Sequence, residues 1–377
     1  MAVYLDNAAT TPVAPEVVDV MISTLKDSFG NPSSSHSYGR QVKALLETSR
    51  RSIAKHLNCQ PSELIFTSGG TEADNMALQS AISQLGVKHI ITSALEHHAV
   101  GHTAEALANK VKVSYVRVCN KGHVDLNHLE ELLQSGEKTL VSLMHANNEI
   151  GTKIDLYKVS ALCRRYDAYF HSDTVQTMGH YRFDLRDLDI DFITCAAHKF
   201  HGPKGIGFLY VNKNVKVEPL IHGGAQERGF RGGTENTDGI VGLAKAMDLA
   251  HDDMESHQDH VQGIKSYMIE QLTEYFEDVQ FHGETDPERA LYTVLNVCFP
   301  ANEKSSMLLF TLDLKGVAVS GGSACSSGAS TGSHVLKGIN ADMNRPNARF
   351  SFSRYTTKEE IDFALEQVKS CYEKTLV

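Results

Sequence analysis

Strand-like and helix-like segments alternate along the chain between residues 62 and 212. Residues 62–85 predict a short strand, a glycine turn and an amphipathic helix, and residues 88–110 repeat this pattern. Further strands, some with their loops or helices, are predicted at 111–118, 138–166, 168–179, 191–200 and 205–212. Such alternation predicts an α/β fold with a large, mainly parallel sheet covered by helices.

The pattern changes near residue 250, where a long helical stretch begins. Strands at 291–300 and 349–355, a helix at 304–316 and a final helix from Lys358 predict a smaller α+β domain. No proline-rich linker marks the boundary. We predict a large domain at residues 15–255, and a small domain made of residues 1–14 and 256–377.

Composition argues against several classes of protein. The formal net charge of −10 comes without a basic stripe, so we expect no binding to DNA. No apolar run approaches the roughly 18 residues of a membrane span, and the first residues lack the pattern of a signal peptide. The seven cysteines are widely spaced and form no CxxC pair, so we expect reduced thiols in a cytoplasmic protein.

A glycine turn in "TSGGTEAD" follows the first of these strands. Gly69 and Gly70 would let backbone N–H groups face a ligand, Thr71 offers a hydroxyl, and the next helix presents its positive end. These features suit a phosphate, but they also suit a helix N-cap, and both interpretations stay open. The turn is no GxxxxGKS or GxxxxGKT loop, and "GPKGIG" is no GxGxxG motif, so ATP and NAD are not expected.

Other predicted strands also end in polar residues. Asp173 closes a buried strand, where a carboxylate needs a cation or several donors, and Gln176 follows it; a helix N-cap is the alternative role for Asp173. His97 lies in another loop after a strand. His98 and His102 nearby raise the question of metal binding, but no HExxH pattern supports it, and we expect no metal.

Lys199 stands between a small apolar run and a glycine-rich loop in "CAAHKFHGPKGIG". A lysine becomes a nucleophile when burial or nearby positive charge lowers its pKa. Lys204 lies inside the Gly/Pro turn, where a surface role is expected. A phosphate cradle, a carboxylate for a ring nitrogen, a stacking aromatic residue and a buried lysine together predict pyridoxal 5′-phosphate, held by Lys199 as a Schiff base.

Eight motifs occur in order over nearly the whole chain: "YLDNAATTP", "TSGGTEADN", "EHHAV", "HANNEIGT", "HSDTVQTMG", "AAHKFHGPKGIGFLYV", "HGGAQERGFRGGTEN" and "GSACSSGAS". Together they closely resemble the cysteine desulfurases of the NifS/IscS type. That resemblance implies a class V aminotransferase-like fold, the fold-type I architecture of pyridoxal-phosphate enzymes. It also implies a homodimer that converts L-cysteine to L-alanine.

The resemblance implies roles around the cofactor. Lys199 would carry the cofactor and move the substrate α-proton. His97 would stack on the cofactor ring and would count, with Lys199 and Cys325, among the catalytic residues. Asp173 would pair with the pyridinium nitrogen, and Gln176 would bond the phenolate oxygen. The phosphate would be held by Gly70, Thr71 and His198, with Thr234 contributed to the partner's phosphate site.

The resemblance also implies a substrate site. Asn148 would lie near substrate and ring, and Arg349 would receive the substrate carboxylate. Arg354 lies five residues on, so on an extended strand it would face the other way. Ala196 stands where many relatives have a serine that donates to the phosphate, a loss worth roughly 1.5–3 kcal/mol unless a neighbour replaces it.

Cys325 would decide the reaction. Its run "VSGGSACSSGASTGSHVL" is small and polar, a poor place to bury a structural cysteine, so this thiol is either incidental or a nucleophile, and the motif favours the nucleophile. Its thiolate would take the substrate sulfur as a persulfide and supply an acceptor protein, for iron–sulfur cluster assembly or for tRNA or thio-cofactor modification. Two alternatives remain: a selenocysteine lyase or aminotransferase of the same fold, and a non-catalytic sulfur carrier.

Overall fold

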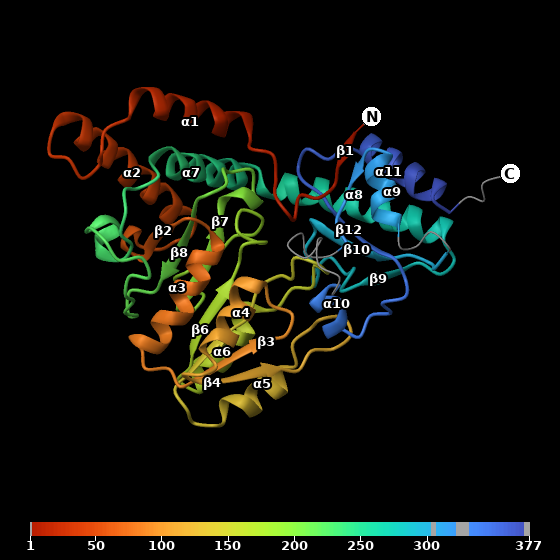
Figure 1. Cartoon of the computed structure of the whole chain (residues 1–377), viewed down its shortest axis with the longest axis horizontal. Helices are drawn as coiled ribbons and strands as arrows, with labels where there is room; N and C mark the ends of the chain where they lie inside the picture. The colour runs from red at the N-terminus through yellow and green to blue at the C-terminus, as the bar shows by residue number, and fades with distance from the viewer. Residues whose placement is uncertain (1, 303–306, 322–331, 373–377) are drawn as a thin grey trace.

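The computed structural model describes residues 2–302, 307–321 and 332–372, and a seven-stranded sheet forms its largest layer (Figure 1). The strands lie in the order β2 (Leu64–Thr67), β8 (Gly207–Val211), β7 (Phe192–Ala196), β6 (Tyr169–Asp173), β5 (Thr139–Ser142), β3 (His89–Ser93) and β4 (Lys112–Val116). Only β8 runs antiparallel to its neighbours in this sheet. The predicted α/β fold with a mainly parallel sheet is confirmed.

Helices cover both faces of this sheet. On one face, α3 (Gly70–Ser83) and α4 (His98–Leu107) pack over an apolar cluster. A second apolar cluster on the other face is covered by α1 (Pro15–Asp27), α2 (Ser37–His56), α5 (Leu126–Leu133), α6 (Leu156–Arg165) and α7 (Thr237–Asp252). Because central strands are then buried on both sides, they consist of nearly continuous apolar runs rather than alternating ones.

A separate three-stranded antiparallel sheet lies toward the C-terminal end of the chain (Figure 1). In it β10 (Val294–Cys298) lies between β9 (Gln280–His282) and β12 (Asn347–Ser351), and residues of α8 (Met254–Tyr275) and α11 (Lys358–Ser370) complete its apolar core. Two short helices, α9 (Leu308–Leu314) and α10 (His334–Gly338), follow β10 along the chain.

The first strand of the chain joins this C-terminal region. β1 (Val3–Tyr4) pairs in parallel with β11 (Val317–Ala318), and Val3 and Leu5 belong to the same apolar cluster as β10 and β12. The pairing supports the proposed division into residues 15–255 and residues 1–14 with 256–377, which stays a prediction. Among the described helices, none is long and apolar enough to cross a membrane.

Candidate active site

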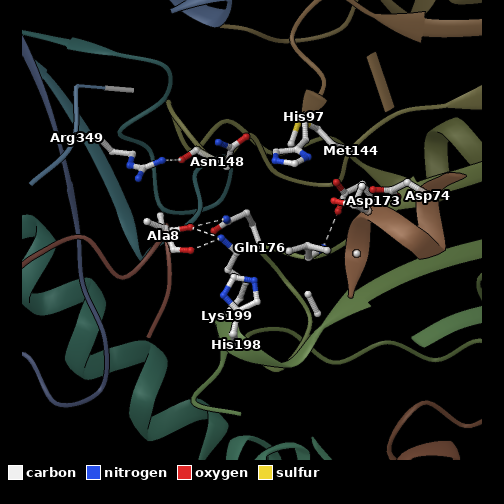
Figure 2. A pocket seen from close by; sticks show the side chains of 15 residues that line it. Ala8, Asp74, His97, Met144, Asn148, Asp173, Gln176, His198, Lys199 and Arg349 are labelled. Carbon is white, nitrogen blue, oxygen red and sulfur yellow. Dashed lines mark hydrogen bonds between the residues drawn. The ribbon is translucent and has the colours of Figure 1, made fainter. Parts of the chain in front are cut away.

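A cavity of about 270 Å³ opens where the carboxyl ends of the parallel strands meet β12 (Figure 2). The structure brings together, in its wall, these expected residues: Gly70, Thr71, His97, Asn148, Asp173, Gln176, His198, Lys199 and Arg349. Thr234 is exposed and does not line this cavity. Cys325 lies outside the described residues. The loops after β2, β3, β5, β6 and β7 thus converge on one site, as carboxyl ends of parallel strands do.

One part of the cavity wall is formed by the start of helix α3. Helix α3 begins at Gly70, so its first N–H groups lack partners within the helix and point toward the cavity. A Cβ added at Gly70 would lie 2.8 Å from Val175 Cγ2, which means that only glycine keeps this surface open. The N-cap position is Gly69, which has no side-chain cap. The observed geometry therefore favours the cradle over the N-cap interpretation.

His198 also lines the cavity. Its Nδ1 is 3.1 Å from Thr10 Oγ1, which fixes the ring against the N-terminal segment. Burial, with the positive charges of Lys199 and Lys204 adding, lowers the pKa of His198 to about 4. The ring is therefore neutral at pH 7, and it can take part in a hydrogen bond but adds no positive charge.

Asp173 also lines the cavity, at the last position of β6, and is 5% exposed. Its Oδ1 accepts a hydrogen bond from the Val175 N–H at 2.9 Å. Burial, and then the nearby carboxyl of Asp74, raises the pKa of Asp173 to about 6, while His97 opposes the shift. A carboxylate in this setting favours a cationic partner.

His97 caps the start of α4, where its Nδ1 accepts a hydrogen bond from the Ala99 N–H at 3.2 Å. Burial lowers its pKa below the usual value, so the ring is neutral at pH 7. Figure 2 shows the imidazole on the same wall as Met144, across the cavity from Lys199. A neutral, fixed imidazole suits stacking on a flat ligand.

Lys199 ends a short 3₁₀ helix that follows β7 directly. Its Nζ donates to the carbonyl oxygens of Ala8 at 2.6 Å and Ala9 at 2.8 Å, and Gln176 Nε2 donates to Ala8 at 3.0 Å (Figure 2). The N-terminal segment therefore orients the amine inside the cavity. Lys204, the alternative lysine, is exposed.

Arg349 enters the cavity wall from β12 and is 1% exposed. Its Nη1 donates to the Asn148 carbonyl at 2.9 Å and its Nη2 to Asp6 Oδ1 at 2.7 Å. Its Nε has no hydrogen-bond partner within the described part of the chain. Arg354 follows the end of the strand and lines a different, smaller cavity, where it donates to the Leu249 carbonyl. Of these two arginines, Arg349 is the one that lines the cavity.

Sequence reasoning missed two buried acids beside Asp173. Asp74 lines the cavity and is 1% exposed. Glu96 is 3% exposed, and both of its carboxylate oxygens lie 3.0 Å from the Met144 N–H. Two signals were present: Asp74 follows Thr71 by three residues and so shares its helix face, and Glu96 directly precedes His97.

The three histidines that raised the question of metal binding, His97, His98 and His102, are described in the structure. The ring centroids of His98 and His102 lie 4.5 Å apart in a stacked arrangement, which turns the rings face to face. No group of three or more His, Cys, Asp or Glu among the described residues is arranged to hold a metal ion.

Comparisons with known proteins agree with this architecture. The family model for aminotransferase class-V matches residues 3–363. The cysteine desulfurase IscS of Dictyoglomus turgidum is 43% identical over 379 residues, covering 99% of this chain and 95% of that protein. A solved NifS-like protein superposes with a TM-score of 0.91 at 36% identity, covering 99% of each chain.

A further solved structure, named SspA in complex with cysteine, superposes with a TM-score of 0.80 at 32% identity and covers 94% of this chain and 100% of that one. The similarity to these proteins extends over both sheets and the cavity between them. The chain therefore belongs to the aminotransferase class-V family, and within that family it belongs with the IscS and NifS-like cysteine desulfurases.

Proposed function

We propose that this protein is a pyridoxal-phosphate-dependent cysteine desulfurase that converts L-cysteine to L-alanine and takes the sulfur on Cys325 as a persulfide. The observation that carries the proposal is one cavity that joins an oriented lysine amine, an anion cradle, a buried carboxylate and a buried arginine. Relatives named cysteine desulfurase support the choice of reaction.

The cavity fits the proposed cofactor. The start of α3, with Gly70, Thr71 and His198, would hold the phosphate, because helix N-termini bind anions. Asp173 would face the ring nitrogen, and Gln176 would bond the phenolate oxygen while its amide stays tied to Ala8. When bound, the cofactor would supply an electron sink for a carbanion at the substrate α-carbon.

Residues of this chain would hold the substrate and move its protons. Arg349 would bind the cysteine carboxylate through its unpartnered Nε and neighbouring nitrogen, the fork geometry that suits a carboxylate. Lys199 Nζ would remove the α-proton, and the carbonyls of Ala8 and Ala9 would keep this amine pointing into the cavity. Asn148 would lie beside both substrate and ring.

Cys325 would then act as the nucleophile toward sulfur. Its thiolate forms an S–S bond with the substrate sulfur as the substrate Cβ–S bond breaks. The electron pair of the broken bond stays with the carbon fragment, which takes up a proton and leaves as alanine. The persulfide on Cys325 would pass its sulfur to an acceptor protein, for iron–sulfur cluster assembly or for tRNA or thio-cofactor modification.

The same proposal includes a homodimer in which Thr234 completes the phosphate site of the partner. Thr234 is exposed on a loop outside the cavity of its own chain, which supports a role toward a second copy. The cytoplasmic location predicted from the unpaired cysteines belongs to this proposal as well.

The test compares the wild type with Cys325→Ala and with Cys119→Ala, because Cys119 is an exposed free thiol elsewhere on the surface. Sulfide and alanine released from L-cysteine with excess reductant are measured, together with the absorbance of bound cofactor. We expect Cys325→Ala to lose sulfide release with the cofactor band intact, and Cys119→Ala to match the wild type. If Cys325→Ala released sulfide and alanine as fast as the wild type, the protein would instead be assigned as a selenocysteine lyase or an aminotransferase.

A further inference from the structure

Asp74 is a buried acid of the cavity to which the proposed reaction gives no role. It lies in α3 and is 1% exposed, and Figure 2 shows its carboxyl group beside that of Asp173. Its Oδ1 has no hydrogen-bond partner in the described part of the chain. An ionised carboxylate in such a place is costly unless a cation or several donors meet it.

The groups that face Asp74 come from the elements packed against α3. Strand β6 contributes Asp173 and His171, and the connection from β3 to α4 contributes Glu96, with His97 acting on Asp173. Strand β7 contributes Thr194, which makes a side-chain hydrogen bond with Asp74. His171 Nε2 is the nearest of their nitrogens, 3.4 Å from Asp74 Oδ1.

His171 cannot balance a negative charge on Asp74. The ring is fully buried, and burial lowers its pKa to about 4, so it is neutral at pH 7. Its nitrogens already have hydroxyl partners, Ser142 Oγ at 2.8 Å from Nδ1 and Thr194 Oγ1 at 3.1 Å from Nε2. His97 is neutral as well, since burial lowers its pKa. The groups from β6, β7 and the β3–α4 connection therefore offer Asp74 no cation.

The acids of this cluster differ in what supports their charge. Asp173 accepts the Val175 N–H and stands where a ring nitrogen would bind. Asp74 has no backbone N–H donor of this kind among the described residues; a side-chain hydrogen bond with Thr194 lowers its pKa, but burial outweighs it and raises the pKa to about 7. Burial, with Asp173 and Asp74 adding, raises the pKa of Glu96 well above its usual range. Asp173 therefore ionises first, and its charge then opposes ionisation of Asp74.

We propose that Asp74 is still an un-ionised carboxylic acid when Asp173 has ionised, and that it acts as a positioning residue for Asp173. The inference rests on the proposed function, because it takes Asp173 as the partner of a protonated ring nitrogen. A neutral Asp74 leaves one negative charge opposite one positive charge. An ionised Asp74 would add a second negative charge without a partner and would raise the proton affinity of Asp173.

Infrared difference spectra of the purified full chain test the protonation state directly. Asp191→Asn is the matched control, because Asp191 is also buried but lies 3.0 Å from Arg164 Nη2 and accepts the Phe170 N–H at 2.8 Å. The spectra are compared at about pH 6.5, below the pH at which Asp74 ionises. The wild-type spectrum minus the Asp74→Asn spectrum should show the carbonyl stretch of a protonated acid. Wild type minus Asp191→Asn should show a carboxylate stretch. A carboxylate stretch lost in Asp74→Asn would overturn the proposal.

Urea unfolding gives a second readout. An acid whose pKa is raised on folding stabilises the protein fully below its unfolded pKa of about 3.9, and this contribution is lost as the pH rises toward the folded value. Asparagine does not titrate. We therefore compare the folding equilibrium constants of the wild type and Asp74→Asn. The ratio of the wild-type constant to the variant constant should fall about tenfold per pH unit between about pH 5 and 6.5. A ratio that stays flat over this range would contradict the proposal.

If Asp74→Asn fails to fold, infrared spectra of the wild type alone, recorded at a series of pH values, still test the proposal. One protonated-acid band should disappear near about pH 7, and a spectrum without such a band would overturn the inference. None of these measurements uses cysteine or turnover. They can therefore fail while the desulfurase assignment stands, and a lack of sulfide release with the band present would count against that assignment alone.

Discussion

Arg349 Nη2 lies 2.7 Å from Asp6 Oδ1, an ion pair between residues 343 positions apart in the sequence. The arginine side chain is 1% exposed and the aspartate side chain 18% exposed. A second bond, to the Asn148 carbonyl at 2.9 Å, fixes the plane of the guanidinium group. Asp6 therefore neutralises the buried arginine from one side, while Arg349 Nε has no hydrogen-bond partner among the described residues.

Replacing Asp6 with asparagine should destabilise the protein by about 1–3 kcal/mol, because a buried guanidinium loses its charged partner, which is itself partly exposed. A substrate carboxylate would restore part of the lost charge balance. L-alanine should therefore raise the Tm of Asp6→Asn more than that of the wild type in thermal unfolding. In the control Asp278→Asn, which removes an exposed aspartate from its pair with Arg345, alanine should raise the Tm as much as in the wild type. An equal alanine shift in wild type and Asp6→Asn would contradict this role.

Replacing Arg349 with lysine should weaken substrate binding far more than it changes chemistry. Lysine keeps the charge but loses the planar fork that holds a carboxylate through two parallel bonds. The loss of about 1.5–3 kcal/mol predicts a KM for cysteine that rises about 10- to 150-fold. Arg354→Lys is the matched control, since that arginine lines a different cavity. Steady-state kinetics decide the point, and a KM unchanged in Arg349→Lys would remove Arg349 from the substrate site.

The sequence predicted the strands of the large sheet well because their apolar runs and flanking glycines are local signals. Each of β2 to β8 lies inside a segment predicted to contain a strand. The grouping of the loop residues in one site was also predictable, because parallel strands bring their carboxyl ends to one edge of the sheet. Gly70, Asp173 and Lys199 are residues of this kind.

Partners distant in the sequence could not be predicted in this way. The carbonyl oxygens that orient Lys199 come from Ala8 and Ala9, about 190 positions away. Every residue has a backbone carbonyl, so the sequence does not indicate which ones will accept this hydrogen bond. The pairing of Asp6 with Arg349 depends on the bridge that the segment after β1 makes, through Asp6, with Ser351 of β12. Asp74 has an ordinary helical context, and only the packing of α3 against β6 makes it a buried neighbour of Asp173.

Cofactor binding should weaken as the pH falls below about 6. Burial raises the pKa of Asp173 to about 6, so below that value the carboxyl is increasingly protonated and cannot pair with a protonated ring nitrogen. The dissociation constant of pyridoxal 5′-phosphate, measured by absorbance titration of the apoprotein, should rise as the pH drops through this range. Asp173→Asn should bind more weakly above about pH 6 and lose this part of the dependence. An identical pH profile in that variant would assign the effect to another group.

The loop that carries Thr234 is held in place by a buried ion pair. Arg50 Nη2 lies 2.6 Å from Glu227 Oε1, and the Phe66 N–H donates to Glu227 Oε2 at 2.8 Å. Glu227 and Arg228 adopt left-handed backbone angles, with φ of 45° and 59°, which non-glycine residues keep only when their surroundings enforce them. The loop is therefore fixed in a shape that leaves Thr234 exposed, away from its own cavity.

Mixed dimers test whether Thr234 serves the partner. Thr234→Glu should abolish cofactor binding in a homodimer, because a carboxylate would repel the phosphate, and Lys199→Ala should be inactive as well. In a mixed dimer of the two variants, a shared site combines both substitutions in one cavity and leaves the other intact. Each mixed dimer, isolated through two affinity tags, should then recover about half of the wild-type activity, since one of two symmetric sites is complete. If Thr234 acted only within its own chain, each cavity would carry one substitution and no activity would return.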